Sequence, residues 1–372
     1  MYEKIVIDNF RCFEHLEVGP LARVNLITGA NNVGKTALLE AVYLFAGQEY
    51  PITAARLAEW RGLPPAADQP HAAFASLVRG FSDETAEAEV TGIRSNGEQA
   101  KLRIVAGPRR PRRLPSNGRS ASEEAGAQDF STDAAVWSLM LEVTEADGTV
   151  RRGLAFPERG ELVLVDSQPK LHAFGSEPDR YTPPHGVFVP SRVMPPRRAD
   201  AERLSKLLVA GDQGPVLDLV RLIEPRLREI VPITPAGGEI ILHARLEGEP
   251  RLLPVAVLGD GLVRLLSLAL AMSDAAYGVL LVDEIENGIY HKLTAAVWRG
   301  LARAAKQFGV QLFATTHSYE CVQAAVEAFQ AEEFKDDLAL HRLDRLKDGS
   351  IKATTYDGEA IADAVELNWE VR

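Results

Sequence analysis

An eight-residue glycine-rich segment near the N-terminus constrains the fold more than any other part of the sequence. It matches the pattern G-x-x-x-x-G-K-[ST] at every fixed position, and it consists of Gly29, Ala30, Asn31, Asn32, Val33, Gly34, Lys35 and Thr36. The apolar run from Arg23 to Ile27 is typical of a strand, and the good helix formers after Thr36 predict a buried helix. A strand, a glycine loop and a helix in this order predict a phosphate-binding loop in an α/β protein.

The chemistry of this loop indicates a nucleoside triphosphate, and we expect ATP together with Mg²⁺. Glycines let the chain curl so that successive N–H groups point inward at phosphate oxygens, while the following helix offers its positive end. Lys35 is expected to reach the β- and γ-phosphates, and the hydroxyl of Thr36 to bind Mg²⁺. The next residue, Ala37, is included among the expected ATP-binding residues.

A second segment, from Val279 to Glu284, is an apolar run that ends in two carboxylates. Ligands of α/β sheets bind at the carboxyl ends of the strands, so this position predicts Asp283 beside the metal and Glu284 beside the γ-phosphate. Asp283 would bind Mg²⁺ through water, and Glu284 would orient or deprotonate the attacking water. Taken alone, the two carboxylates could equally cap a helix that begins at Ile285.

A third segment, from Val310 to Thr315, is another apolar run, and it is followed by Thr316, His317 and Ser318. An imidazole at the same sheet edge as Asp283 could donate a hydrogen bond to the γ-phosphate. A lone histidine is more often a surface or capping residue. The position of His317, after a strand that follows the acidic pair, favours a role in the site.

The middle of the chain has a different pattern. Residues 86–166 alternate in polarity and contain Asn96-Gly97 and Asp147-Gly148, which suit tight hairpin turns and predict antiparallel β structure. Within them, residues 107–133 contain almost no large apolar side chain, which predicts a mobile loop. Five arginines lie there: Arg109, Arg110, Arg112, Arg113 and Arg119. We interpret them as solvated charges, with nucleic-acid contact as the alternative.

The second half of the chain alternates between helical and strand patterns. Two helices are predicted between residues 197 and 230, the first ending near Gly211 and the second starting after Pro215, and together they could form a lid. From Gly259 onward, the alternation of helices and strands predicts a parallel sheet. A hairpin at Asp348-Gly349 and a short helix from Gly358 close the chain.

These patterns suggest two regions. Residues 1–48 and 185–372 form the predicted nucleotide-binding core, with the helical lid at about 197–230. Residues 49–184 form an inserted, largely antiparallel β region with a mobile Arg/Pro-rich loop at about 107–133.

The overall charge and the cysteines narrow the function classes. A formal net charge of -11 opposes whole-surface attraction to nucleic acid or anionic membranes, although a local basic groove stays compatible with it. The two cysteines, Cys12 and Cys321, form no CxxC pair, and the N-terminus shows no secretory signal. The apolar runs are too short or too interrupted to cross a bilayer. We therefore expect a cytoplasmic protein without disulfides, zinc or membrane contact.

The order of the motifs resembles ABC-type ATPase heads of the SMC, RecF and OLD group. It is most similar to stand-alone prokaryotic AAA family (ABC-like) ATPases found in DNA repair and anti-phage defence. The resemblance covers about residues 1–48 and 185–372, and it includes Asn9-Phe10-Arg11, Leu258 to Leu262, Asp283 to Gly288 and Thr316-His317-Ser318. It implies a P-loop NTPase fold of the ABC-ATPase type, with a mostly parallel central sheet, helices, an antiparallel β subdomain and a helical lid.

In such heads the glycine-rich signature of one subunit closes over ATP bound to the other subunit. The resemblance assigns this role to Gly259, Asp260 and Gly261, and it implies a homodimer with ATP sandwiched between the heads, or a higher oligomer. Two glycines before a helix can offer unobstructed N–H donors to a γ-phosphate. The segment lacks the serine of the Leu-Ser-Gly-Gly-Gln pattern, and an N-cap by Asp260 is the alternative interpretation.

Departures from the family pattern are informative. The chain has no sustained heptads, so the long coiled coil of SMC proteins is not expected. It also lacks the acidic constellation of the nuclease domain that OLD nucleases carry, so any nuclease activity would come from a partner. No glutamine is assigned to the Q-loop. Arg11 and the pair Arg197-Arg198 stay open between phosphate contacts and surface charges.

The leading hypothesis is a Mg²⁺-dependent ATPase with Glu284, His317 and Lys35 as its catalytic residues. ATP would close a homodimer and hydrolysis would reopen it, and this switch or sensor would act on DNA transactions or on a separately encoded nuclease or toxin. The alternatives are the ATPase subunit of a membrane transporter and an ATP-bound scaffold without turnover. The carboxylate pair favours hydrolysis over the scaffold, and the weak signature disfavours the transporter.

Overall fold

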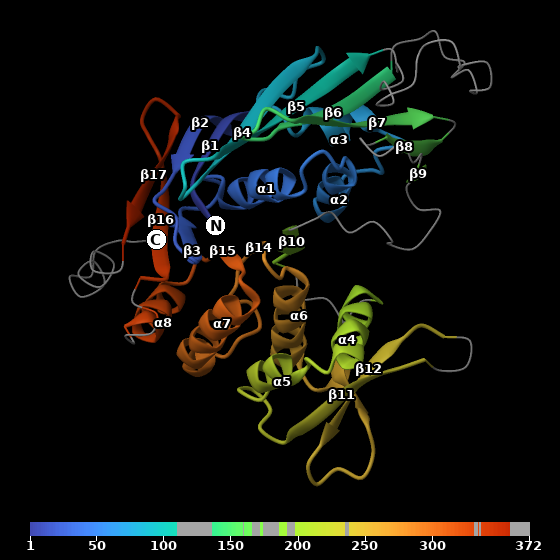
Figure 1. Ribbon diagram of the computed structural model, residues 1–372, viewed down its shortest axis with the longest axis vertical. Helices are drawn as coiled ribbons and strands as arrows, with labels where there is room; N and C mark the ends of the chain where they lie inside the picture. Colours follow the sequence, from blue (N-terminus) through green and yellow to red (C-terminus); the bar gives the residue numbers. More distant parts are fainter. Residues whose placement is uncertain are drawn as a thin grey trace.

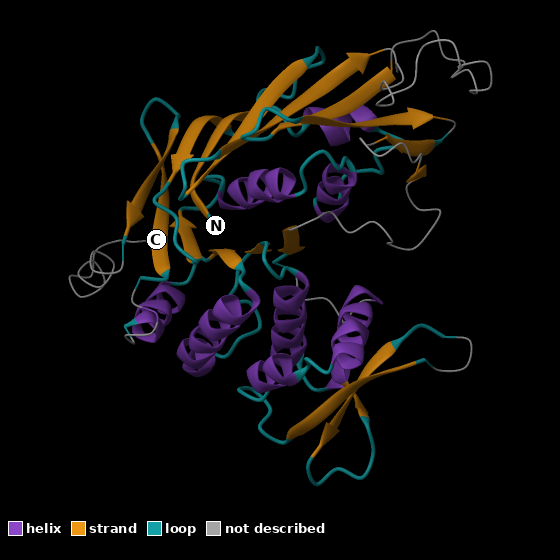
Figure 2. Ribbon diagram, viewed as in Figure 1, coloured by secondary structure: helices purple, strands orange, loops and turns teal. Residues whose placement is uncertain are grey.

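The computed structural model describes residues 1–109, 136–158, 160–165, 172–173, 186–191, 198–234, 238–330, 334 and 336–357. Within these ranges the strands form sheets of eight, six and three strands. Figure 2 shows helices between the two larger sheets, further helices beyond the six-stranded sheet, and the smallest sheet at the far end of the molecule. The six-stranded sheet is therefore covered by helices on both faces.

The six-stranded sheet contains the three segments predicted to build the site. In spatial order its strands are β10 (Gly186–Val189), β14 (Val279–Val282), β15 (Gln311–Thr315), β3 (Val24–Gly29), β16 (Leu338–Arg345) and β17 (Ile351–Tyr356). The first five strands are parallel, and β17 runs antiparallel to β16. Every residue of β14, β15 and β3 is buried, as expected for parallel strands covered on both faces. The predicted α/β fold with a mostly parallel central sheet is confirmed.

The eight-stranded sheet is antiparallel throughout. In spatial order its strands are β2 (Phe13–Val18), β1 (Tyr2–Phe10), β4 (Ala86–Arg94), β5 (Gln99–Arg109), β6 (Val136–Thr144), β7 (Val150–Glu158), β8 (Glu161–Val165) and β9 (His172–Ala173). Gly97 and Gly148 have φ values of 81° and 82° in the predicted hairpin turns. Residues 1–48 thus contribute to both large sheets, and the division into core and insertion stays a prediction.

The helix after the glycine loop, α1 (Lys35–Ala46), lies between the two large sheets (Figure 1). It contacts β3, β10, β14 and β15 of one sheet and β1 and β4 of the other. All of its residues except Thr36 are buried, which explains why its sequence is apolar on most faces. Two short helices, α2 (Ile52–Trp60) and α3 (Pro70–Ala75), continue this layer.

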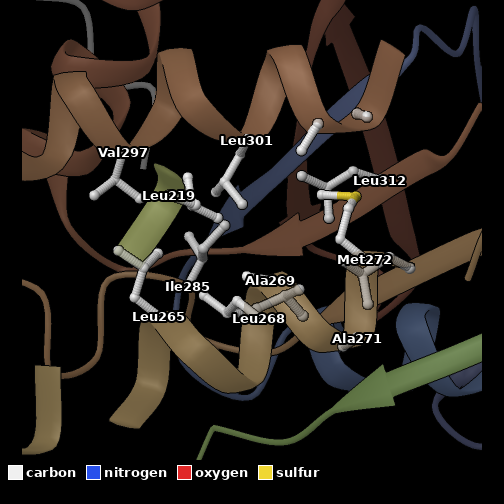
Figure 3. Packing of buried hydrophobic residues seen from close by; sticks show 14 of the residues in the cluster. Leu219, Leu265, Leu268, Ala269, Ala271, Met272, Ile285, Val297, Leu301 and Leu312 are labelled. Atoms are coloured by element: carbon white, nitrogen blue, oxygen red, sulfur yellow. The ribbon is translucent and has the colours of Figure 1, made fainter. Parts of the chain in front are cut away.

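The opposite face of the six-stranded sheet is covered by a row of helices. They are α6 (Asp260–Asp274), α7 (Thr294–Phe308) and α8 (Tyr319–Phe329), with short 3-10 turns at Val255–Val257 (η1) and His291–Leu293 (η2). The helix α4 (Arg198–Ala210) packs against α6, and α5 (Gly214–Val220) packs against α6 and α7. Figure 1 shows α8, α7, α6 and α4 side by side. Figure 3 shows Leu265 and Leu268 of α6 close to Leu301 of α7 and Ile285, within one apolar cluster.

The predicted helical lid is wrong in its last part. The helices α4 and α5 end at Ala210 and Val220, and the following strand β11 (Leu227–Ile233) forms the smallest sheet with β12 (Ile241–Leu246) and β13 (Leu253–Pro254). Leu227 and Ile230 are both buried although they are three residues apart, a spacing typical of a helix. The register of β11 shifts between Leu227 and Glu229, and this irregularity places both side chains on the buried face.

The predicted mobile loop at 107–133 begins too early. Strand β5 continues to Arg109 and pairs with β6 as far as Arg109 and Val136. Gly107 is suited to this strand because a Cβ there would lie 2.5 Å from the Cα of Thr85. The rest of the predicted loop, with Arg110, Arg112, Arg113 and Arg119, lies outside the described residues, as do Arg197 and the helix predicted from Gly358. None of the described helices is long and apolar enough to cross a membrane.

Candidate nucleotide-binding site

The glycine loop connects the buried strand β3 to α1, and its conformation requires glycine at both ends. Gly29 and Gly34 have φ values of 133° and 102°, and Asn32 has a φ of 60°. A Cβ on Gly29 would lie 2.3 Å from the carbonyl oxygen of Leu343 in β16, and one on Gly34 would lie 2.8 Å from the Sγ of Cys12. The backbone therefore curls in a space that no other side chain could share.

Lys35 lies across this loop. Its Nζ donates hydrogen bonds to the carbonyl oxygens of Gly29 (2.7 Å) and Ala30 (2.9 Å), and the residue is only 5% exposed. Burial lowers the pKa of Lys35, and the nearby Asp283 opposes that shift. Arg345 of β16 supports the loop from outside by donating to the carbonyl oxygen of Asn32 at 3.0 Å. An ammonium in this position is available to anionic oxygens that enter the loop.

The remaining residues of the predicted ATP-binding segment differ in burial. Ala30, Asn31 and Asn32 are exposed, as expected for a loop that meets a ligand through its backbone. Val33 and Ala37 are buried. These two side chains secure the loop and the first turn of α1 against the core, so only their backbone groups could face a phosphate.

Asp283 and Thr36 lie next to each other, although they are far apart in the sequence. The hydroxyl of Thr36 donates to the two carboxylate oxygens of Asp283 at 3.1 and 3.2 Å. The hydroxyl of Thr315 donates to the Oδ1 of Asp283 at 2.7 Å, and Asp283 is 8% exposed. The parallel strands β14, β15 and β3 are neighbours, so their carboxyl ends bring these side chains together.

Glu284 and His317 also meet at this edge of the sheet. The Nε2 of His317 lies 3.6 Å from the Oε1 of Glu284, and Asn287 donates to the Oε2 of Glu284 at 2.7 Å. Glu284 has a left-handed backbone with a φ of 48°, and its N–H donates to the hydroxyl of Thr315. No helix begins at Ile285, where the chain forms turns, so the alternative interpretation of Asp283 and Glu284 as helix caps is wrong.

The predicted signature lies at the start of α6. Gly259 occupies the N-cap position with a φ of 102°, and Asp260 is the first helical residue, so an N-cap by Asp260 is wrong. A Cβ on Gly261 would lie 2.5 Å from the carbonyl oxygen of Gly288, which places the signature against the turn that follows Glu284. Gly259 and Asp260 are exposed. Within the described residues, no hydrogen bond joins this segment to the glycine loop of its own chain.

Two further groups at the site were not predicted from the sequence. Arg264 of α6 is 2% exposed, and it donates to the carbonyl oxygens of Pro190 (2.6 Å) and Asp283 (2.9 Å). Burial lowers the pKa of Arg264 to about 10, so it stays charged at neutral pH. Asn287 belongs to the Asp-Glu-Ile-Glu-Asn-Gly segment, but no role for it was predicted from the sequence. An arginine within an otherwise apolar helical run was the available signal for Arg264.

Glu40 organises a buried charge cluster on α1. It is 2% exposed, and its carboxylate meets the Nε of Arg11 at 2.6 Å and the Nε of Arg61 at 2.6 Å. Hydrogen bonding to Glu40 raises the pKa of Arg61, to which Asp283 also contributes. Arg11, which the sequence left open, is thus bound to Glu40 and to the carbonyl oxygen of Ser76. Arg198 is an exposed residue paired with Glu202.

The donor set at Thr36 and Asp283 fits Mg²⁺. A hydroxyl and a carboxylate are oxygen ligands, and Mg²⁺ in nucleotide sites usually takes one or two protein ligands together with phosphate oxygens and waters. Among the described residues, no group of three or more His, Cys, Asp and Glu side chains could bind a metal ion. Phosphate oxygens would supply further ligands, so Mg²⁺ would bind here together with a nucleotide.

A glycine loop between a strand and a helix, with an acidic strand end beside its threonine, defines a P-loop nucleotide-binding protein. A family model described as "AAA domain, putative AbiEii toxin, Type IV TA system" matches residues 24–322. This match spans most of the chain, and the protein belongs to this family. The resemblance to ABC-type ATPases of the SMC, RecF and OLD group is thereby confirmed.

Individual proteins are similar to this chain over different lengths. A protein of Helicobacter pylori named ATP/GTP phosphatase is 21% identical over an alignment of 365 residues, and the match covers 96% of each chain. The DNA replication and repair protein RecF of Nitrosococcus oceani is 53% identical over 38 residues, 10% of each chain. Among solved structures, an SMC head bound to the C-winged helix domain of ScpA covers 96% of this chain and 98% of its own, with 14% identity and a TM-score of 0.49.

Proposed function

We propose that this protein is a Mg²⁺-dependent ATPase that dimerises on ATP and works as a switch or sensor. The observation that supports the proposal best is the contact of Thr36 with Asp283 beside the glycine loop. Two oxygen donors from separate motifs meet where the β- and γ-phosphates of a bound triphosphate would lie. The relative named ATP/GTP phosphatase, similar over 96% of both chains, supports turnover as well as binding.

Different residues of the chain bind the phosphates and activate the attacking water. The backbone of residues 29–34 and the ammonium of Lys35 bind the phosphates, and bound Mg²⁺ would neutralise developing negative charge. Lys35 must exchange its bonds to Gly29 and Ala30 for phosphate oxygens. Glu284 orients the attacking water or accepts its proton, and His317, whose Nε2 lies 3.6 Å from the Oε1 of Glu284, donates toward the γ-phosphate.

Dimerisation is supported by the exposed surface around the signature. Val257 is 69% exposed just before Gly259, and Tyr290 is 55% exposed just after Gly288. The contact between Gly261 and Gly288 brings these two segments together. Exposed apolar side chains beside free N–H groups suit a surface that closes over nucleotide bound to a second copy. A higher oligomer would need a further surface.

The output partner is proposed from the family. Its description names a putative toxin of a Type IV toxin–antitoxin system. We propose in addition a separately encoded nuclease or toxin as the effector, in anti-phage defence. The RecF similarity suits a role in DNA repair. We place the protein in the cytoplasm, where ATP and Mg²⁺ are supplied.

The outer face of the eight-stranded sheet does not favour DNA contact. Four basic side chains of the described part of this sheet are paired with glutamates on neighbouring strands: Lys4 with Glu17, Lys101 with Glu89, Arg103 with Glu87 and Arg152 with Glu142. The charges cancel within each of these four pairs, whereas a DNA-binding face needs uncompensated positive charge. Any DNA contact is therefore expected elsewhere on the protein.

Steady-state turnover of Mg²⁺-ATP by the wild type and by Glu284→Gln tests the proposal. We expect the variant to bind ATP but to lose turnover by about 100-fold or more, because a general base typically contributes 10²–10⁴-fold. Glu87→Gln, an exposed residue of the sheet, is the control. Undiminished turnover in Glu284→Gln would refute the assigned base.

The dimer is tested on the same variant by light scattering with and without ATP. Glu284→Gln should trap the ATP-bound dimer, because it binds nucleotide without releasing phosphate. A mass that ATP leaves unchanged would refute the dimer switch. Tight ATP binding without turnover in the wild type would instead support the scaffold alternative.

A further inference from the structure

The carboxylate of Glu284 has a fixed partner within its own turn. Asn287 donates from Nδ2 to the Oε2 of Glu284 at 2.7 Å, which is the shortest contact of this carboxylate among the described residues. His317 lies farther away, with its Nε2 3.6 Å from the other carboxylate oxygen. The contact of Asn287 with Glu284 at 2.7 Å is a strong hydrogen bond. The contact of His317 with Glu284 at 3.6 Å is beyond hydrogen-bond range.

The amide of Asn287 is itself fixed at a second point. The same Nδ2 donates to the carbonyl oxygen of Ser191 at 3.0 Å, so both of its hydrogens are used. The N–H of Asn287 donates to the carbonyl oxygen of Glu284 at 3.1 Å and closes the turn. The side chain of Asn287 therefore bridges Glu284 and the end of β10, and it can rotate only by losing a bond.

The anchor at the end of β10 is rigid. The N–H of Asp283 donates to the carbonyl oxygen of Val189 and continues the parallel pairing of β10 with β14. Arg264 joins the carbonyl oxygens of Pro190 and Asp283 from the buried side. Consecutive carbonyls at 190 and 191 are thus tied to the segment that contains Glu284, one through Arg264 and one through Asn287.

Glu284 needs such a partner because its own backbone does not restrain its carboxylate. The residue is about one third exposed, and a glutamate has several rotatable bonds, so its carboxylate would otherwise sample many positions. Its left-handed backbone costs energy that the surrounding hydrogen bonds must offset. A donor that meets one carboxylate oxygen leaves the other oxygen free for water.

We propose that Asn287 is a positioning residue for Glu284, holding its carboxylate where it orients the attacking water. This inference rests on the proposed ATPase function and adds a residue to it. Asn287 acts through Glu284 and does not touch nucleotide in this role. Its loss therefore lowers the rate of the chemical step and leaves nucleotide binding intact.

The test measures kcat and KM for Mg²⁺-ATP, and the Kd of a non-hydrolysable ATP analogue, in Asn287→Ala and Asn287→Asp. Both variants remove the donor, and the aspartate keeps the shape of the side chain. We expect kcat to fall by about 10- to 100-fold, the range caused by a misplaced catalytic group, with KM and Kd within about twofold of the wild type. Asn96→Ala, in an exposed hairpin turn, is the matched control and keeps the wild-type kcat.

Coupling to Glu284 separates positioning from a general structural role. In the Glu284→Gln background, Asn287→Ala should cause no further loss of residual turnover, because the group that it positions has already been disabled. Multiplied losses would overturn the inference, as would an unchanged kcat or a Kd that rises in parallel with the fall in kcat. If Asn287→Ala fails to fold, the same kinetic measurements are made on Asn287→Asp.

Failure of the inference is distinguishable from failure of the proposed function. A wild-type protein without ATP turnover would refute the function itself and the positioning role with it. A wild type that hydrolyses ATP, loses turnover in Glu284→Gln and keeps it in both Asn287 variants would refute the positioning role alone.

Discussion

At the scale of single residues, the glycine loop is determined by close backbone approaches. Gly29 lies so near β16 that an added Cβ would overlap the carbonyl oxygen of Leu343. Backbone atoms cannot move aside as the end of a side chain can. The identity of this residue therefore follows from its neighbour across the sheet as well as from the ligand.

Gly29→Ala should lose nucleotide binding. We expect the Kd of a fluorescent ATP analogue to rise by about tenfold or more, equivalent to at least about 1.4 kcal/mol, because the loop must shift to remove the overlap. Gly148→Ala is the control, since Gly148 has a similarly positive φ but open space around it. Unchanged affinity in Gly29→Ala would show that the loop tolerates the added atom.

Arg264 is a buried charged residue whose hydrogen-bond partners are backbone carbonyl oxygens. Arg264→Met leaves the carbonyl oxygens of Pro190 and Asp283 without their donor. We expect the free energy of unfolding to fall by about 2 to 4 kcal/mol, the cost of leaving one buried and one partly buried acceptor unpaired. The free energy of unfolding of Arg264→Lys should lie between those of Arg264→Met and the wild type, since an ammonium cannot reproduce the guanidinium fork. Urea unfolding followed by circular dichroism measures both, and a loss below about 0.5 kcal/mol would contradict the expectation.

At the scale of elements, β16 combines a parallel and an antiparallel neighbour around one buried histidine. His341 pairs in register with Ile27 of β3 and Thr355 of β17, and it is fully buried. Its Nε2 contacts the Oδ1 of Asn25, and its Nδ1 contacts the hydroxyl of Thr355. Burial lowers the pKa of His341 to about 3, so the folded protein keeps the ring neutral.

This histidine predicts a loss of stability in acid. The unfolded chain binds a proton below a pKa of about 6.5, while the folded chain binds none until about pH 3. The contribution of His341 is therefore complete above pH 6.5 and declines as the pH falls, by about 2 to 3 kcal/mol between pH 7 and pH 4.5. Urea unfolding at pH 7 and at pH 4.5 should show that the free energy of unfolding falls less in His341→Gln than in the wild type. Equal declines in the two proteins would rule out His341 as a source.

At the scale of the whole molecule, α1 joins the two large sheets. It contacts four strands of one sheet and two of the other, and nearly all of its side chains are buried. The same helix begins at the glycine loop, so the nucleotide site and the eight-stranded sheet share one structural element. A disturbance of α1 reaches both layers because each packs directly against it (Figure 1).

Leu44→Ala tests this shared dependence. Leu44 is fully buried, and we expect its truncation to lower the free energy of unfolding by about 2 to 5 kcal/mol, the usual cost of a cavity at a leucine site. Val209→Ala on α4 is the control, because Val209 is 91% exposed and should change stability by about 0.5 kcal/mol or less. Two separate unfolding transitions in Leu44→Ala, with one unchanged, would contradict the shared role of α1.

Local patterns predicted much of the site and the order of the central elements. The glycine loop, the strands that end before Asp283 and Thr316, and the hairpins at Gly97 and Gly148 were all apparent from local chemistry. Strand β11 was missed because its bulge imitates helical spacing. The partners of Glu40 were missed because Arg11 and Arg61 come from segments with no shared pattern.

The sequence by itself determined which segments carry phosphate-binding and acidic chemistry, because glycine conformations, strand patterns and motif spacing are local properties. Only the tertiary structure decided that Thr36 meets Asp283, that Arg264 donates to the carbonyls of Pro190 and Asp283, that Asn287 donates to the carbonyl of Ser191, and that Gly261 packs on Gly288. These contacts join residues from different elements. Their geometry depends on how parallel strands and helices stack, which no local pattern encodes.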